Sequence, residues 1–120
     1  MTSERRFVFK VVSRDAWDVA RRAGAFAGSA DDARDGFIHL SVSTQLEGTL
    51  AKHFRNQDDL VLVKFEAHAL GDGLRWELSR GGEEFPHLYG ALPTALALSV
   101  DALRLGDDGV PQLPEEFNPC

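Results

Sequence analysis

Two histidines lie at the centres of short segments in which polar or aromatic residues alternate with apolar ones. They are His39 in residues 37–41 and His87 in residues 85–89. Side chains alternate between the two faces of a strand, so each histidine shares its face with aromatic or polar neighbours. The shared faces carry Phe37, His39 and Ser41 on the first strand, and Phe85, His87 and Tyr89 on the second. An aromatic wall with a few polar groups suits a small planar ligand, and the two strands together predict one pocket.

Charged residues that precede the second histidine are further candidates: Arg75 and Glu77 on a predicted strand over residues 74–78, then Arg80 and Glu84. A guanidinium group can fork onto phosphate oxygens, and a carboxylate can orient a ribose hydroxyl or stabilise positive charge at an anomeric carbon. The alternative is a solvated strand face whose ion pairs contribute under about 1 kcal/mol. The candidate catalytic residues are His39, Glu77, Glu84 and His87, and the candidate ligand-binding residues are Phe37, Ser41, Arg75, Arg80 and Tyr89.

Motifs for other kinds of chemistry are missing from the sequence. It has no His-x-His pair, no HExxH and no cysteine cluster, so no metal site is predicted. Ser41 lacks the G-x-S-x-G turn of a serine hydrolase, and neither glycine-rich phosphate loop is present. His53 falls on an apolar helix face and is expected to pack there, whereas His68 falls in a turn and is expected to be solvated.

The composition predicts one domain with an acidic balance. The chain has 120 residues, of which 43% are hydrophobic, and can bury a core without disulfide or metal support. The net charge of −6 disfavours a nucleic-acid partner but is compatible with a small phosphate site. No apolar run approaches the ~18 residues of a membrane helix, so no membrane partner is expected. The single cysteine, Cys120, excludes an intramolecular disulfide and fits the cytoplasm.

Hydrophobic patterning predicts an α+β domain with a mainly antiparallel sheet and two covering helices. Strands are expected over residues 7–12, 37–41, 60–66, 74–78, 85–89 and 97–104, and helices over residues 14–23 and 44–55, with residues 25–35 as a polar loop. The expected core residues are Trp17, Ile38, Leu40, Leu50, Phe54, Val61, Val63 and Trp76. Residues 1–106 would form the domain, followed by an acidic, proline-containing tail over residues 107–120.

These landmarks resemble those of a small bacterial family known as domain of unknown function 952. The resemblance extends from Phe9 to about Leu105 and is carried by Trp17 and residues 36–41, 59–65, 74–77 and 85–90. It implies a fold similar to that of the ADP-ribosyltransferases, in which a split antiparallel sheet clasps NAD in a cleft between its halves. NAD or ADP-ribose is therefore the ligand that the resemblance implies.

The segment that begins at Ile38 also looks like the RNA 2′-phosphotransferases of the same superfamily. That likeness implies that His39 faces the nicotinamide ribose or an internal phosphate. A third motif would fall at Glu83, Glu84 and His87. The first motif of these enzymes is a tyrosine-histidine-glycine-threonine strand, and this chain has Phe-Lys-Val-Val at residues 9–12 instead. Whether Lys10 takes over from the missing histidine is left open by the sequence.

Two functions of different classes follow. In the first, the chain is similar to an ADP-ribosyltransferase or 2′-phosphotransferase and binds, or acts on, NAD, ADP-ribose or another phosphorylated nucleoside. In the second, a degenerate transferase scaffold serves as a non-catalytic ligand-binding or protein-interaction module. A specific response to nucleotides favours the first, and indifference to nucleotides with capture of a particular protein favours the second.

Overall fold

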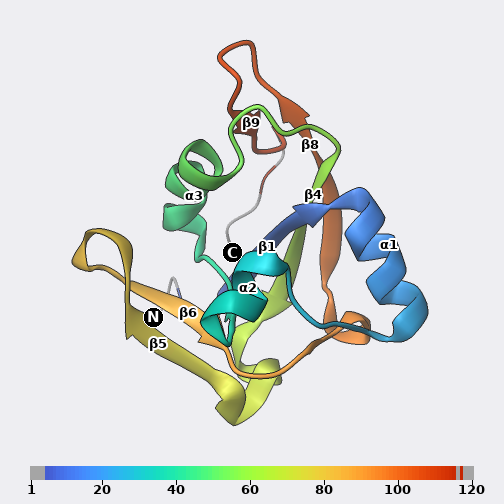
Figure 1. Cartoon of the computed structure of the whole chain (residues 1–120), viewed down its shortest axis with the longest axis vertical. Coiled ribbons are helices and arrows are strands. Elements are labelled where there is room, and N and C mark those ends of the chain that lie inside the picture. Colours follow the sequence, from blue (N-terminus) through green and yellow to red (C-terminus); the bar gives the residue numbers. More distant parts are fainter. Residues whose placement is uncertain (1–4, 116, 118–120) are drawn as a thin grey trace.

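Antiparallel strands form the framework of the protein, whose computed structural model describes residues 5–115 and 117 (Figure 1). One sheet has the order β1 (Phe7–Ser13), β4 (Leu60–Glu66), β8 (Ser99–Leu105) and β9 (Pro111–Gln112). A second has the order β3 (Ile38–His39), β6 (Glu84–Leu88) and β5 (Leu74–Leu78), and a short ribbon pairs β2 (Ala25–Phe26) with β7 (Leu92–Pro93). All these pairings are antiparallel, which confirms the prediction of a mainly antiparallel sheet. Helices accompany the strands, which confirms the mixed helix-and-strand class.

The chain segment that follows Ile38 belongs to both sheets in turn. Within β3, His39 pairs with His87 of β6, and the Leu40 N–H still donates to the Pro86 carbonyl at 3.1 Å. Ser41 then turns to β1 and exchanges two backbone hydrogen bonds with Phe9, at 2.8 and 3.0 Å. The strand expected over residues 37–41 is therefore short, because the chain changes its pairing partner in the middle of that stretch.

Helices in the described part of the chain are α1 (Arg14–Ala23), α2 (Ala30–Asp35) and α3 (Leu46–His53). Shorter 3₁₀ turns are η1 (Ser43–Gln45), η2 (Ala67–Gly73), η3 (Arg80–Gly82) and η4 (Thr94–Leu96). The first helix has the predicted bounds, because the Ser13 hydroxyl accepts the Ala16 N–H and Gly24, at φ +93°, ends it. None of these helices is long and apolar enough to cross a membrane.

Two predicted segments differ from the structure for local reasons. The helix expected over residues 44–55 begins as η1, where the Gln45 side chain accepts the Val42 N–H and donates to the Glu84 carbonyl. The loop expected over residues 25–35 contains α2, so the prediction of two covering helices missed one helix. A reciprocal capping box starts α2: the Ser29 hydroxyl accepts the Asp32 N–H, and the Asp32 carboxylate accepts the Ser29 N–H.

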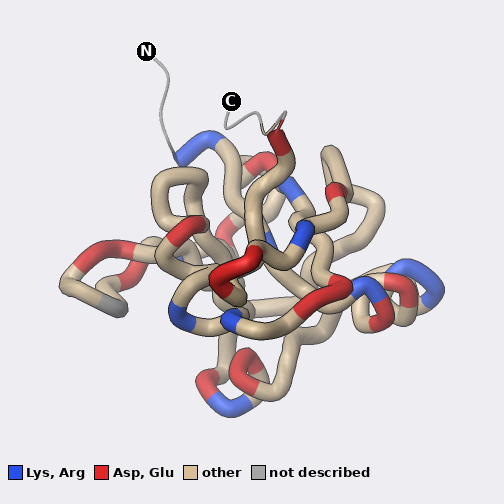
Figure 2. Tube along the Cα trace, turned by 90° about the horizontal axis from the view of Figure 1, so that it is seen from above, with Lys and Arg blue, Asp and Glu red and all other residues tan. Residues whose placement is uncertain are grey.

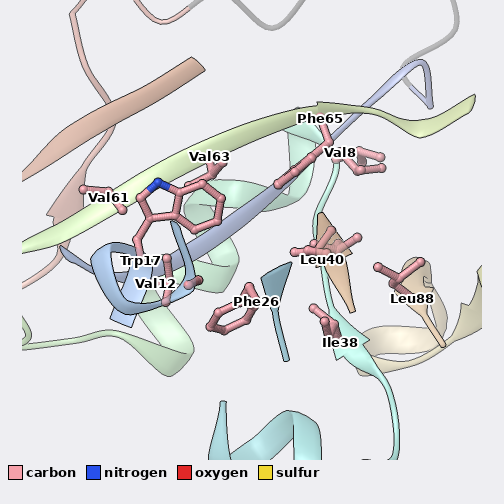
Figure 3. Close-up of a cluster of buried hydrophobic side chains, with 13 residues drawn as sticks. Val8, Val12, Trp17, Phe26, Ile38, Leu40, Val61, Val63, Phe65 and Leu88 are labelled. Atoms are coloured by element: carbon pink, nitrogen blue, oxygen red, sulfur yellow. The ribbon is translucent and has the colours of Figure 1, made fainter. Parts of the chain in front are cut away.

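The apolar run of β4 is buried on both faces of the first sheet, as its composition predicts. Val61, Val63 and Phe65 pack with Trp17 of α1 on one face, in a cluster that extends to Ile38, Leu40 and Leu88 (Figure 3). Leu60 and Leu62 pack on the other face with Phe9, Val11, Leu46, Leu50 and Leu103. Of the expected core residues, Trp17, Ile38, Leu40, Leu50, Val61 and Val63 are buried, while Phe54 and Trp76 are only partly buried.

Part of the expected C-terminal tail is integrated into the fold. β9 pairs with the end of β8 through Arg104 and Leu105, and these strands extend the first sheet. Val110, Leu113 and Phe117 pack against the second hydrophobic cluster. Residue 116 and residues 118–120 lie outside the described residues. The ordered domain therefore continues beyond residue 106, because apolar side chains interrupt the acidic and proline residues of this segment.

Leu50→Ala should lower the free energy of unfolding by about 2–5 kcal/mol, because this side chain is 1% exposed and its truncation leaves a cavity. Leu78→Ala is the matched control: the side chain is 71% exposed, and we expect a change within about 0.5 kcal/mol. Urea titration followed by tryptophan fluorescence measures both. Equal effects of the two substitutions would contradict this account of the core.

Candidate functional site

The two sequence-predicted histidines are direct cross-strand neighbours. His39 of β3 lies opposite His87 of β6, so both side chains project from the same face of the second sheet. The centroids of their rings are 5.7 Å apart. Both rings line one cavity of about 460 Å³, a size within the range of about 300–1,000 Å³ that is usual for small-ligand pockets.

The cavity lies where the second sheet separates from β1. Phe9 uses its N–H and C=O for Ser41, and alternation along β1 turns the backbone groups of Val11 toward the same side. A continued ladder would place His39 opposite Val11, but the His39 N–H donates to Asp32 and its C=O accepts from Lys10 instead. The cavity wall accordingly includes Val11 together with residues of α2, α3 and β6. The hollow beside the histidines thus lies where side chains replace the ladder between β1 and this segment.

The Asp32 carboxylate is the centre of the polar network behind the cavity. It is buried, and it accepts the Ser29 N–H at 2.8 Å, the His39 N–H at 3.0 Å and the Lys10 ammonium at 3.0 and 3.3 Å. A fourth partner is Nδ1 of His39, at 2.6 Å. Burial alone raises the pKa of Asp32, but Lys10 and these hydrogen bonds outweigh it and lower the pKa to about 2. Asp32 is therefore a fixed negative charge.

Lys10 is the counter-ion of this buried carboxylate. Its Nζ donates to both oxygens of Asp32 and, at 3.0 Å, to the backbone carbonyl of His39. Burial lowers the pKa of Lys10, while the charge of Asp32 acts in the opposite direction. The three ammonium protons have three acceptors, so Lys10 holds the network together. Lys10 thus supports both the backbone and the carboxylate partner of His39.

His39 is held between two carboxylates. While Nδ1 contacts Asp32, Nε2 lies 2.9 Å from Oδ2 of Asp35. Asp35 also accepts hydrogen bonds from Arg34 at 3.0 and 3.3 Å, which lower the pKa of the Asp35 carboxyl. Each ring nitrogen of His39 therefore has a carboxylate oxygen within hydrogen-bond distance.

His87 has a different environment. Its Nδ1 lies 2.8 Å from Oε1 of Glu77, and the Tyr89 hydroxyl donates to that same oxygen at 2.8 Å. These two hydrogen bonds lower the pKa of Glu77, and the interaction with Glu77 raises the pKa of Tyr89. Phe37 stacks on the His87 ring with centroids 4.0 Å apart and planes inclined by 24°. The second imidazole is therefore fixed by one carboxylate and one aromatic ring.

The structure brings some of the predicted site residues together and separates others. His39, Ser41 and His87 line the cavity, and Phe37, Glu77 and Tyr89 support the histidines from outside the described lining. Arg75 and Glu84 do not line it. The guanidinium of Arg75 lies 5.6 Å from the Tyr89 ring, and Glu84 forms an exposed ion pair with Arg5 at 2.7 Å. The side chain of Arg80 lies outside the described part of the structure.

The expected placement of Tyr89 and an arginine of residues 75–80 on the same cleft therefore needs correction for Tyr89 and Arg75. Both lie on the histidine face of the sheet, but neither belongs to the described cavity lining. The Tyr89 hydroxyl is directed to Glu77, and the Tyr89 ring contacts Phe37. Sharing a strand face therefore did not ensure sharing a cavity.

Three residues of the site were not recognised from the sequence, namely Asp32, Arg34 and Asp35, and neither was the buried partner of Lys10. Two signals for them exist. A lysine in the apolar run of residues 7–12 requires a buried partner, and Ser29 with Asp32 has the spacing of a capping box. Neither signal shows that the two features meet, because β1 and α2 are brought together only by the tertiary fold.

Comparison with known proteins shows which family has this fold and site. The chain belongs to the family described as "Protein of unknown function (DUF952)", whose model matches residues 11–100. It is similar to protein CC0527 from Caulobacter crescentus: a crystal structure is 50% identical with a TM-score of 0.86 and covers 88% of this chain and 93% of that one. A solution NMR structure of CC0527 is 48% identical with a TM-score of 0.83, and the match covers 93% of this chain and 97% of that one. No curated protein matches the chain.

Asp32 should make the folded chain less stable in acid. Its pKa of about 2 lies below the ordinary value of 3.8, so the unfolded chain binds this proton more readily. The stabilisation is complete above about pH 4 and is lost as the pH falls toward about 2, by about 2 kcal/mol. Urea titrations at pH 5 and pH 2 measure this loss. Asp32→Asn cannot titrate, and an unchanged pH dependence in this variant would contradict the assignment.

Proposed function

We propose that the cavity binds a small phosphorylated nucleoside of the NAD and ADP-ribose class, on a scaffold similar to the split sheet of the ADP-ribosyltransferases. The observation that carries the proposal is the pair of cross-strand histidines facing one cavity of about 460 Å³. Each imidazole is oriented by a carboxylate, so its hydrogen-bonding direction is set before a ligand arrives. Such convergent polar groups in a concave site are typical of small-molecule binding.

The cavity lining contains groups that suit both parts of a nucleotide. Phe9, Phe54 and Phe85 supply an apolar aromatic side that suits a base or nicotinamide ring. Arg34 and Lys52 are basic residues of the lining and can take phosphate oxygens. Arg34 is added to Arg80, the arginine expected to take a phosphate, whose side chain lies outside the described part of the structure. His39 also belongs to the lining and can bond to a ribose hydroxyl.

Charge distribution favours a small ligand over a nucleic acid. Lys and Arg residues are scattered among Asp and Glu residues along the chain (Figure 2), and the net charge of the sequence is −6. A polynucleotide backbone needs a continuous basic surface, whereas one or two phosphates need only a local donor set.

Binding is favoured over ADP-ribosyl transfer. Cleavage of the bond to nicotinamide builds oxocarbenium character, which a carboxylate facing the anomeric carbon would stabilise. Glu77 is occupied by His87 and Tyr89, and Glu84 pairs with Arg5 outside the described cavity lining. The engagement of both proposed carboxylates supports the second candidate function, a non-catalytic ligand-binding module on a degenerate transferase scaffold.

Isothermal titration with ADP-ribose tests the proposal. His39→Ala and Arg34→Ala each remove a hydrogen-bonding side chain from the cavity and should weaken binding about ten- to hundredfold. Arg22→Ala is the matched control, because Arg22 is an exposed residue of α1 that does not belong to the described lining. It should bind like the wild type.

Two outcomes would overturn the nucleotide pocket. One is the absence of heat and of NMR shifts when the wild-type chain meets millimolar ADP-ribose, NAD or nucleoside 2′-phosphate. The other is equal affinity in the wild type, His39→Ala and Arg34→Ala. Either result transfers support to a protein-interaction module.

A further inference from the structure

We propose that His39 and His87 form an acid–base pair that hydrolyses a cyclic phosphodiester of a nucleoside. The inference rests on the proposed function, because the substrate must occupy the same cavity, and it adds a reaction that needs no carboxylate facing an anomeric carbon. It is carried by the different hydrogen bonding of the two imidazoles, which face one cavity from paired strands.

His87 is held as a proton acceptor. Glu77 accepts a hydrogen bond at Nδ1, which leaves the lone pair of the neutral ring on Nε2. Nε2 has no hydrogen-bond partner among the described residues, and His87 belongs to the cavity wall. Stacking on Phe37 fixes the plane of the ring. A carboxylate at one nitrogen and an open second nitrogen are the features of a general base.

His39 is held as a proton donor to an anion. Asp32 engages Nδ1 from behind, and Nε2 donates to Asp35, which the Arg34 guanidinium also contacts. The carboxylate of Asp35 thus occupies a position where an anion receives donors from both His39 and Arg34. Its side chain is 33% exposed and lies on the cavity wall, so a phosphate oxygen can take its place without disturbing the buried Asp32.

Hydrolysis of a phosphodiester needs these two proton transfers. One proton leaves the attacking water while another reaches the departing oxygen, on roughly opposite sides of phosphorus. Imidazoles with centroids 5.7 Å apart can serve the two oxygens of one phosphate. In a nucleoside 2′,3′-cyclic phosphate the phosphate, the ribose and the leaving oxygen all belong to one small molecule, which suits a cavity of about 460 Å³.

The reaction consumes only water. Nε2 of His87 removes a proton from water as the new P–O bond forms, and the bond from phosphorus to one ribose oxygen breaks. That oxygen takes the proton from Nε2 of His39, which gives a nucleoside monophosphate with a free hydroxyl. His87 then releases its proton to solvent and His39 regains one, so the protein returns to its starting state.

Phosphorus NMR of the full chain with 2′,3′-cyclic AMP tests the proposal, and proton–nitrogen NMR titration of the same samples reports binding. The wild type should produce the monoester, and its kcat/KM should have a bell-shaped pH profile. His39→Gln and His87→Gln should each lower kcat at least about a hundredfold, as expected for the loss of a general acid or base. His68→Gln is the control, because His68 is exposed in η2 and is not part of the described lining.

Each outcome decides the matter. Binding of 2′,3′-cyclic AMP without monoester would overturn the acid–base pair but leave the proposed function intact. Absence of binding by 2′,3′-cyclic AMP, ADP-ribose and NAD would overturn both. Turnover that survives both histidine substitutions would also overturn the pair. If one of the two histidine variants does not fold, the other should still lack either the acidic or the basic side of the bell-shaped kcat/KM profile. A folded variant that keeps both sides of the profile would contradict the inference.

Discussion

The structure depends on one buried ion pair, between Asp32 and Lys10, and on the hydrogen bonds that surround it. Asp32 closes the capping box of α2, neutralises the lysine of β1 and orients the ring of His39. A buried carboxylate is costly unless every lone pair has a partner, and here donors from three elements supply them. The same interaction therefore assembles the fold locally and prepares the site, because the polar groups that must be satisfied are those that hold the histidine.

The second determinant is a backbone constraint. Backbone groups of successive residues point to opposite edges of a strand, so Leu40 bonds to β6 while Ser41 bonds to β1. The His39 groups on the β1 edge bond to Asp32 and Lys10, so the ladder beside Val11 is interrupted. The cavity lies beside this interruption, and His39 is part of its wall.

The environments of the two imidazoles show why neighbours of the same type need not have the same chemistry. His39 lies between Asp32 and Asp35, while His87 has one carboxylate and an open nitrogen. Strand pairing places the two residues opposite each other, with ring centroids 5.7 Å apart. The different hydrogen-bonding partners of the two rings are more informative about function than the number of histidines.

The sequence by itself determined the features that follow from local periodicity. The alternation around His39 and His87 predicted which side chains share a face, and the apolar run of β4 predicted burial on both sides. Tertiary structure alone decided that Lys10 meets Asp32, that the Tyr89 hydroxyl bonds to Glu77, and that Glu84 turns to Arg5. The physical reason is that strand faces are set by neighbours one or two residues away, whereas the partner of a buried charge is set by how distant segments pack.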